Sequence, residues 1–308
     1  MQIKKTFLTE IQPGEPLEHR GIAIAPVFPR RQPVADYVTL HEALPLGFRV
    51  TEVDAAGSVP ELAVDNPLDH DVLLYDGEEL VGAKQNRIVA ATILVPARAK
   101  TRIPVACVEE GRWSRRSDAF AAAPHAAYPE LRRRKALRQS AQPFAAGVAQ
   151  AEVWAAVGER AAEYRVHSHT RAQADVYRAR GDSIAELRDA FPLAPGQSGA
   201  LFAVGGEICL DVVSRPDAFA RLYAKLLEGY LLDALAAAQP REPGAFDRFL
   251  ADLDAAPRSR RPSVGRGEDV RLQGDRVVGS ALELDGELIQ LCAYSTADRR
   301  RSVRNVIE

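Results

Sequence analysis

Short apolar runs rich in valine, isoleucine, leucine and threonine alternate with turn-forming residues through the first third of the chain. This pattern is typical of β-strands joined by tight turns. Residues 48–53 alternate, which predicts one solvated face, whereas residues 88–95 are almost wholly apolar and predict a strand buried on both faces. Asp76-Gly77 lies between two further runs and predicts a hairpin, because such turns require positive φ at both positions.

Helical spacing of apolar residues begins near residue 150. We expect one helix over residues 150–166, a turn at residues 167–170, and a second helix that ends near Arg180. Ser183 and Glu186 have the spacing of a capping box, in which each side chain bonds a free amide of the other's turn. This predicts a third, short helix that ends near Phe191.

The clearest helix follows Ser214, which we expect to cap it, with Pro216 in the first turn. Its apolar positions recur at helical spacing: Phe219, Leu222, Tyr223, Leu226, Leu227, Tyr230, Leu231 and Ala234.

Strands are expected on both sides of this helix. Residues 199–213 predict a hairpin that turns at Gly205-Gly206, and residues 277–294 predict another that turns at Asp285-Gly286. A further strand is expected at residues 269–272. Residues 257–267 contain four arginines and two prolines and predict a flexible loop.

Residues 114–148 form a segment of different character, rich in alanine and arginine and weakly periodic. It contains the basic run Arg132-Arg133-Arg134-Lys135. Such a run is more typical of a solvated face or a mobile connector than of a nucleic-acid patch. We therefore interpret residues 114–148 as a connector.

Composition excludes several classes of protein. The 308 residues are 46% hydrophobic and 27% charged, which is typical of a globular chain. Forty basic and 42 acidic residues give a net charge of −2, so nucleic-acid binding through overall charge is not expected. The three cysteines are far apart, and no run approaches the ~20 apolar residues of a membrane helix. With no secretory signal pattern at the N-terminus, we expect a soluble, cytoplasmic protein that does not bind membranes.

The sequence lacks the phosphate loop, the dinucleotide fingerprint, the H-E-x-x-H metal motif and the G-x-S-x-G nucleophile motif. It instead carries two dense polar motifs in the β region, residues 76–87 and residues 107–113. Glu78 and Glu79 point to opposite faces of a strand, so only one can enter a shared site, and the same applies to Glu109 and Glu110.

One carboxylate from each motif, with a neighbouring cation, would support general acid/base chemistry or bind a cationic or hydroxyl-rich ligand. The alternative is an exposed loop with surface ion pairs that each contribute about 0–1 kcal/mol. The candidate catalytic residues are Glu79 and Glu109. The candidate ligand-binding residues are Lys84, Gln85, Asn86, Arg87, Glu110, Arg112 and Trp113. No metal ligands are assigned.

Four residues also have a structural interpretation. The adjacent acids oppose a thiolate at Cys107, which is therefore expected to be a buried structural cysteine. His167 and His169 are expected in a surface turn, and no partners complete a metal site. Trp113 is either a hydrophobic anchor or a stacking platform, and the sequence leaves both open.

Residues 77–88 and 103–113 resemble the ARG and rhodanese-phosphatase-superfamily-associated protein domain, where ARG denotes ADP-ribosylglycohydrolase. Further matches are residues 150–154, residues 168–170, and residues 197–214 with the following helix, so the similarity covers about residues 15–295. The resemblance implies a role near NAD or ADP-ribose metabolism. It assigns no cofactor and no catalytic residues to this chain.

Together these patterns predict an α+β fold with an antiparallel β-sandwich or barrel-like core, a helical insertion and a long amphipathic helix. Because the resemblance spans most of the chain, we expect one domain over residues 1–308. Its parts are a β-rich region (15–113), the connector (114–148), the helical insertion (149–192), and a region of hairpin, helices and returning strands (197–295).

Two principal hypotheses follow for function. In the first, the polar motifs bind or process a nucleotide-sugar-like ligand such as ADP-ribose. In the second, the chain is a non-enzymatic interaction module, including a homo-oligomer, whose motifs pair with one another. A metal-dependent hydrolase built from scattered carboxylates and histidines is a third, weaker alternative. The sequence leaves open whether the protein is an enzyme.

Overall fold

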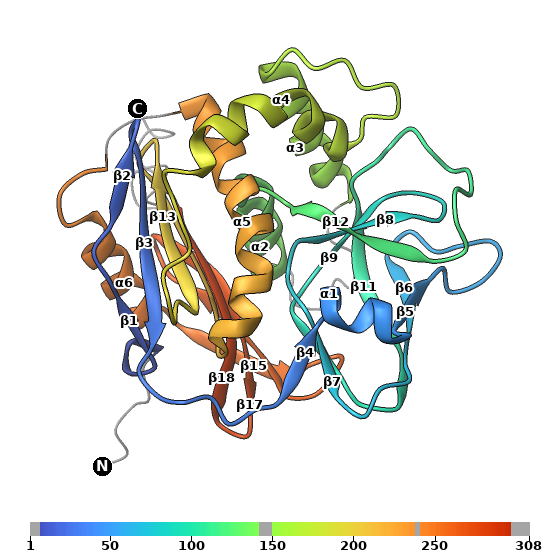
Figure 1. Ribbon diagram of the computed structural model, residues 1–308, viewed down its shortest axis with the longest axis horizontal. Coiled ribbons are helices and arrows are strands. Elements are labelled where there is room, and N and C mark those ends of the chain that lie inside the picture. The colour runs from blue at the N-terminus through green and yellow to red at the C-terminus, as the bar shows by residue number, and fades with distance from the viewer. Residues whose placement is uncertain (1–6, 142–149, 238–240, 297–308) are drawn as a thin grey trace.

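The computed structural model describes residues 7–141, 150–237 and 241–296 and has a mixed α+β architecture (Figure 1). The largest sheet of these residues has nine strands in the order β1-β3-β13-β14-β18-β17-β16-β15, with β2 also paired to β3. Their bounds are β1 (Ile11–Pro13), β2 (Leu17–His19), β3 (Ile22–Pro29), β13 (Gly199–Val204), β14 (Glu207–Val213), β15 (Arg258–Pro262), β16 (Glu268–Gln273), β17 (Val277–Leu284) and β18 (Glu287–Ser295).

Two smaller sheets lie on the other side of the molecule. One has the order β12-β8-β9-β11-β6-β5, and because its end strands β12 and β5 approach each other, it curls like part of a barrel. The other has the order β10-β7-β4, with β4 and β7 parallel. Their bounds are β4 (Tyr37–Thr39), β5 (Arg49–Thr51), β6 (Glu61–Asn66), β7 (Asp71–Leu74), β8 (Glu78–Gly82), β9 (Arg87–Val89), β10 (Ile93–Val95), β11 (Ala99–Cys107) and β12 (Phe120–Ala126).

Helices separate and cover these sheets. The helices of the described residues are α1 (Leu40–Ala43), α2 (Pro129–Ala141), α3 (Gln150–Glu163), α4 (Gln173–Arg188), α5 (Pro216–Ala237) and α6 (Ala245–Ala255), with 3₁₀ turns η1 (Phe7–Thr9) and η2 (Leu44–Leu46). Helices α2 and α5 lie between the large sheet and the smaller sheets, whereas α6 covers the opposite face of the large sheet (Figure 1). The predicted α+β fold with antiparallel, barrel-like sheets is confirmed.

Strand alternation decides which side chains of the large sheet face α5. Ala200, Phe202 and Val204 of β13 pack in the core beneath α5, whereas Leu201 and Ala203 pack toward α6. On β14 the same alternation turns Asp211 toward the α2 and α5 side. Every apolar position predicted for the long helix is buried, as its periodicity indicated. Both hairpins of this sheet turn where predicted, with positive φ at Gly205-Gly206 and at Asp285-Gly286.

The predicted hairpin at Asp76-Gly77 is wrong. Strand β7 pairs with β10 and β4, whereas β8 pairs with β9 and β12, so the two residues connect different sheets. Gly77 has a φ of 85°, but Asp76 does not adopt positive φ. A Cβ on Gly77 would lie 2.8 Å from the Cδ of Arg132, so the glycine here permits a close approach to α2.

The interpretation of residues 114–148 as a connector is also wrong for the described part, because it contains β12 and α2. Arg132 and Lys135 are only 0% and 2% exposed. Positions three residues apart share one helix face, so two of the four basic side chains point into the interior. There they meet Asp211 and Asp76, two acids distant in sequence.

Three further local predictions are wrong. Helix α4 runs without a break from Gln173 to Arg188, so Ser183 lies inside a helix whose amides already have backbone acceptors. The strand predicted over residues 88–95 is divided between β9 and β10, which belong to different sheets. The predicted loop at residues 257–267 contains β15, an edge strand that pairs with β16.

A buried ion pair joins the two halves of the molecule. Arg132 donates to both oxygens of Asp211, at 2.9 and 2.6 Å, and the hydroxyls of Tyr75 and Tyr230 each donate to the same carboxylate at 2.6 Å. Burial raises the pKa of both tyrosines, so they remain donors. The carboxylate is thus fully satisfied by groups from α2, α5 and the segment after β7.

We predict that Arg132→Met lowers the free energy of unfolding by about 3–5 kcal/mol, because it leaves the Asp211 charge buried without its cation. Urea denaturation followed by circular dichroism measures this. Arg138→Met on the same helix is the matched control: its 46% exposed side chain pairs with Glu152 at the surface, and we expect a loss below about 1 kcal/mol. Equal losses in the two variants would contradict the role given to the buried pair.

Candidate functional site

Strand pairing brings the two polar motifs together. Strand β9 pairs antiparallel with β11, with Arg87 opposite Cys107, so the turn before β9 lies beside the segment after β11. Gly82 and Ala83 in this turn have φ angles of 124° and 36°. The turn carries Gln85 and Asn86 directly to the second motif.

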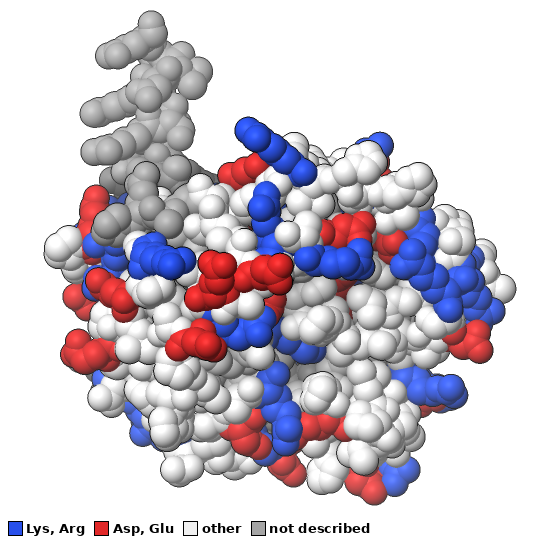
Figure 2. Space-filling model, turned by 45° about the horizontal axis from the view of Figure 1, so that its top comes forward, with Lys and Arg blue, Asp and Glu red and all other residues white. Residues whose placement is uncertain are grey.

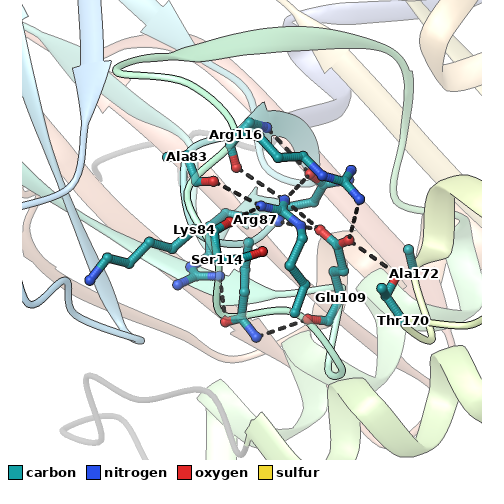
Figure 3. A network of polar contacts seen from close by, with 12 residues as sticks. Ala83, Lys84, Arg87, Glu109, Ser114, Arg116, Thr170 and Ala172 are labelled. Atoms are coloured by element: carbon teal, nitrogen blue, oxygen red, sulfur yellow. Dashed lines mark hydrogen bonds and ion pairs between the residues drawn. The ribbon is translucent and has the colours of Figure 1, made fainter.

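Glu109 and Arg112 form the centre of this network (Figure 3). Glu109 Oε2 accepts from Arg112 Nη2 at 2.6 Å and from the Asn86 amide at 3.0 Å, and Oε1 accepts from Thr170 Oγ1 at 3.1 Å. Arg112 also donates to the side-chain oxygen of Asn86 and to the carbonyl oxygens of Gly82, Ala83 and Ser114. Both side chains are therefore enclosed and paired within the chain.

Glu79 lies at a second buried position linked through Asn86. Its carboxylate accepts from Asn86 Nδ2 at 3.2 Å and from Gln173 Nε2 at 2.6 Å, and it bonds His125 Nε2 at 2.9 Å. Glu79 is 0% exposed. Glu78 points to the other face, as strand alternation predicts, and pairs with Lys225 at 3.0 Å.

The electrostatics of the network stabilise the ionised form of Glu109. Burial alone raises the pKa of Glu109, but the hydrogen bonds from Arg112 and the Asn86 amide outweigh burial and hold that pKa below its ordinary value. At Cys107 burial dominates and raises the pKa of the thiol. The thiol lies 3.1 Å from Gln85 Oε1 and is 0% exposed, in agreement with a buried structural cysteine.

Lys84, Arg87 and Trp113 form a second group beside the network, which we call the Trp113 corner. Lys84 Nζ and Arg87 Cζ lie 5.3 and 5.6 Å from the Trp113 ring centroid. The Lys84 side chain runs away from Glu109 (Figure 3) and donates to the Ala55 and Ala56 carbonyl oxygens. Arg87 is 0% exposed and donates to Gln85 Oε1, but its Nε and Nη2 have no partner among the described residues.

The predicted residues therefore separate into three sets. Glu79, Gln85, Asn86, Glu109 and Arg112 lie in one hydrogen-bonded network, Lys84, Arg87 and Trp113 lie in the corner beside it, and Glu110 pairs with Arg171 at the surface.

Sequence reasoning missed His125, Thr170 and Gln173. His125 and Gln173 each bond Glu79, and Thr170 bonds Glu109. Only Thr170 had a sequence signal, through the resemblance at residues 168–170. His125 comes from β12, Gln173 from α4 and Thr170 from the segment before α4. Hydrogen bonds between such distant segments carry no local pattern.

Two cavities of the structure lie elsewhere and are lined by other residues. One, of about 590 Å³, lies between residues 29–36, the β17–β18 turn and the end of β14. The other, of about 510 Å³, lies between α2, α3, the β13–β14 turn and the end of α5. Across the described residues, no group of three histidine, cysteine, aspartate or glutamate side chains is arranged to hold a metal ion.

On the face shown in Figure 2, basic and acidic side chains are interspersed. Such a face does not provide the continuous basic stripe that tracks a phosphate backbone. Within the described part of the chain, no helix is long and apolar enough to cross a membrane.

Comparison with known proteins identifies the family to which the chain belongs. A family model described as the ARG and Rhodanese-Phosphatase-superfamily-associated Protein domain matches residues 10–294. No curated protein and no solved structure gives a significant match. The matched region contains both polar motifs and the β12, α4 and α5 elements that enclose them. Because the match extends over most of its length, this chain belongs to the ARG and Rhodanese-Phosphatase-superfamily-associated Protein domain family.

Proposed function

We propose that this chain is a non-catalytic interaction domain, which binds another protein or a second copy of itself, and that its two polar motifs stabilise the scaffold. The observation that carries the proposal is the enclosure of Glu109 and Arg112, whose hydrogen bonds all come from within the chain, with only Arg112 Nε lacking a partner among the described residues. A general acid or base must reach the proton it transfers, at about 2.6–3.2 Å. Glu79 and Glu109 are instead 0% and 1% exposed.

Two further observations support a scaffold role. Glu79 and Glu109 form hydrogen bonds with side chains of β12, of α4 and of the segment that precedes α4. The motifs therefore attach the helical region to the curled sheet. The family description also names association with ARG and rhodanese-phosphatase proteins, which supports a partner-binding role. A family association is only a prior for function, so the proposal depends on the geometry.

We predict that Glu109→Gln lowers the free energy of unfolding at pH 7 by about 1.5–3 kcal/mol, because it removes the charge that Arg112 bonds. The folded-state pKa of Glu109 lies below the ordinary value of 4.5, so its contribution is complete above pH 4.5 and is lost as the pH falls through the folded-state pKa. The difference between wild type and variant should therefore shrink below pH 4.5, as urea denaturation at a series of pH values measures.

Glu110→Gln is the matched control, because this side chain pairs with Arg171 at the surface. We expect it to change stability by at most about 1 kcal/mol at every pH. A Glu109→Gln protein as stable as wild type, with a specific activity lost, would contradict the scaffold role.

A second candidate function is the binding of a nucleotide-sugar-like ligand such as ADP-ribose at the Trp113 corner. Arg87 favours it, because two of its guanidinium nitrogens have no partner among the described residues, although this 0% exposed side chain is reached only if the ligand displaces the groups that cover it. Trp113 is 47% exposed and offers a stacking face, with Lys84 beside it. Guanidinium groups suit phosphate oxygens, and aromatic rings stack on nucleobases. In this candidate Glu110 lies at the rim rather than in contact with the ligand.

For this candidate, millimolar ADP-ribose or NAD should raise the melting temperature and quench the fluorescence of Trp113. Arg87→Ala should remove both effects, each measured against the variant's own ligand-free state. Arg102→Ala, at a 71% exposed side chain on β11, is the control and should retain them. If wild-type protein shows neither effect, the candidate is excluded and the interaction domain remains.

A further inference from the structure

The loop that joins β5 and β6 lies against the Trp113 corner, and we call its residues 52–59 the flap. The Gly57 amide donates to the carbonyl oxygen and to the carboxylate of Asp54, at 3.2 and 2.9 Å, so the flap is a compact turn. A Cβ on Gly57 would lie 3.4 Å from Cζ2 of Trp113 and 3.1 Å from Cδ of Lys84. The tip of the flap therefore rests on two of the three side chains of the corner.

Lys84 attaches the flap to the corner. Its Nζ donates to the carbonyl oxygens of Ala55 and Ala56, and its backbone amide donates to Oε1 of Glu52 at 3.1 Å. These bonds join the flap to the turn before β9, and none of them belongs to a strand ladder. The flap can therefore detach from the corner while the curled sheet stays paired.

Arg87 presents one complete edge of its guanidinium to the corner without a bonded acceptor. The two nitrogens without a partner among the described residues are Nε and Nη2, whereas Nη1 donates to Gln85 Oε1. Nε and Nη2 are the pair that binds two oxygens of one anion, as Arg98 does with both oxygens of Asp69 at 2.7 and 2.8 Å. The vacant edge of Arg87 thus matches an anion with two adjacent oxygens.

Glu52, at the base of the flap, has the complementary deficiency. Its Oε2 is buried and has no hydrogen-bond partner within the described ranges of the chain. Burial lowers the pKa of the Arg87 guanidinium, and the negative charge of Glu52 opposes that lowering, so the two charges act on each other. A buried carboxylate oxygen and a buried guanidinium edge, each with a hydrogen bond unmade, gain by meeting.

We propose that Glu52 is an internal anion for Arg87, which closure of the flap brings onto the Nε and Nη2 edge and which an anionic ligand must displace. The inference rests on the second candidate function, because it states what regulates ligand binding at the Trp113 corner. The ligand class that competes is a phosphate or pyrophosphate group, since it offers a guanidinium the same pair of oxygen acceptors as a carboxylate.

A double-mutant cycle on the ligand-free full chain tests the contact between Glu52 and Arg87. Glu52→Gln should lower the melting temperature by about 2–4 °C in the wild-type background. It should leave the melting temperature unchanged in the Arg87→Met background, where the cation is already absent. Glu61→Gln is the matched control, because Glu61 pairs with the exposed Arg102, and its effect should be the same in both backgrounds.

Isothermal titration with inorganic pyrophosphate tests the competition. Glu52→Gln should bind pyrophosphate about tenfold more tightly than wild type, because the ligand no longer displaces a carboxylate, which corresponds to about 1.4 kcal/mol. Glu61→Gln should bind it with wild-type affinity, which separates a local contact from a general loss of negative charge. Arg87→Met should not bind it.

The two tests separate this inference from the function on which it rests. Equal pyrophosphate affinity in wild type and Glu52→Gln would overturn the inference and leave the second candidate function standing. Equal effects of Glu52→Gln on the melting temperature in the two backgrounds would overturn it as well. Absence of pyrophosphate binding in both wild type and Glu52→Gln would exclude the second candidate function, and the proposed competition with it.

Discussion

The Asp211 carboxylate is the point on which the two halves of the structure depend. It belongs to β14, a central strand of the large sheet. Its four hydrogen bonds come from Arg132 on α2, Tyr75 after β7 and Tyr230 on α5. A carboxylate in an apolar interior is tolerated only when its lone pairs are satisfied. Because the partners come from separate elements, satisfying this one group fixes the relative position of the sheet, both helices and the smaller sheets.

The same physical rule explains why the polar motifs form an enclosed network. Glu79 and Glu109 lie in the interior, and each is compensated by several donors from other segments. Such a network stabilises one arrangement of the strands and encloses both carboxylates. Polar density along a strand is thus compatible with a scaffold as well as with a site, and the burial of both carboxylates supports the scaffold proposed for them.

Unsatisfied groups mark the places where the structure favours a ligand. At the Trp113 corner, two guanidinium nitrogens of Arg87 have no partner among the described residues, which suits an anion. A buried polar group without a partner is costly, so each position is a candidate for a molecule that supplies the missing hydrogen bond.

The sequence by itself determined the α+β class, the long helix α5, and the hairpins at Gly205-Gly206 and Asp285-Gly286, because periodicity and turn chemistry act between neighbouring residues. It also located the two polar motifs in the β region, whereas the pairing of β9 with β11 that joins them came from the structure. Only the tertiary structure decided that Asp76-Gly77 joins two sheets and that the basic run of α2 is divided between core and cleft. The reason is that a charged side chain takes its environment from partners far along the chain, as Arg132 does from Asp211, and no local pattern records them.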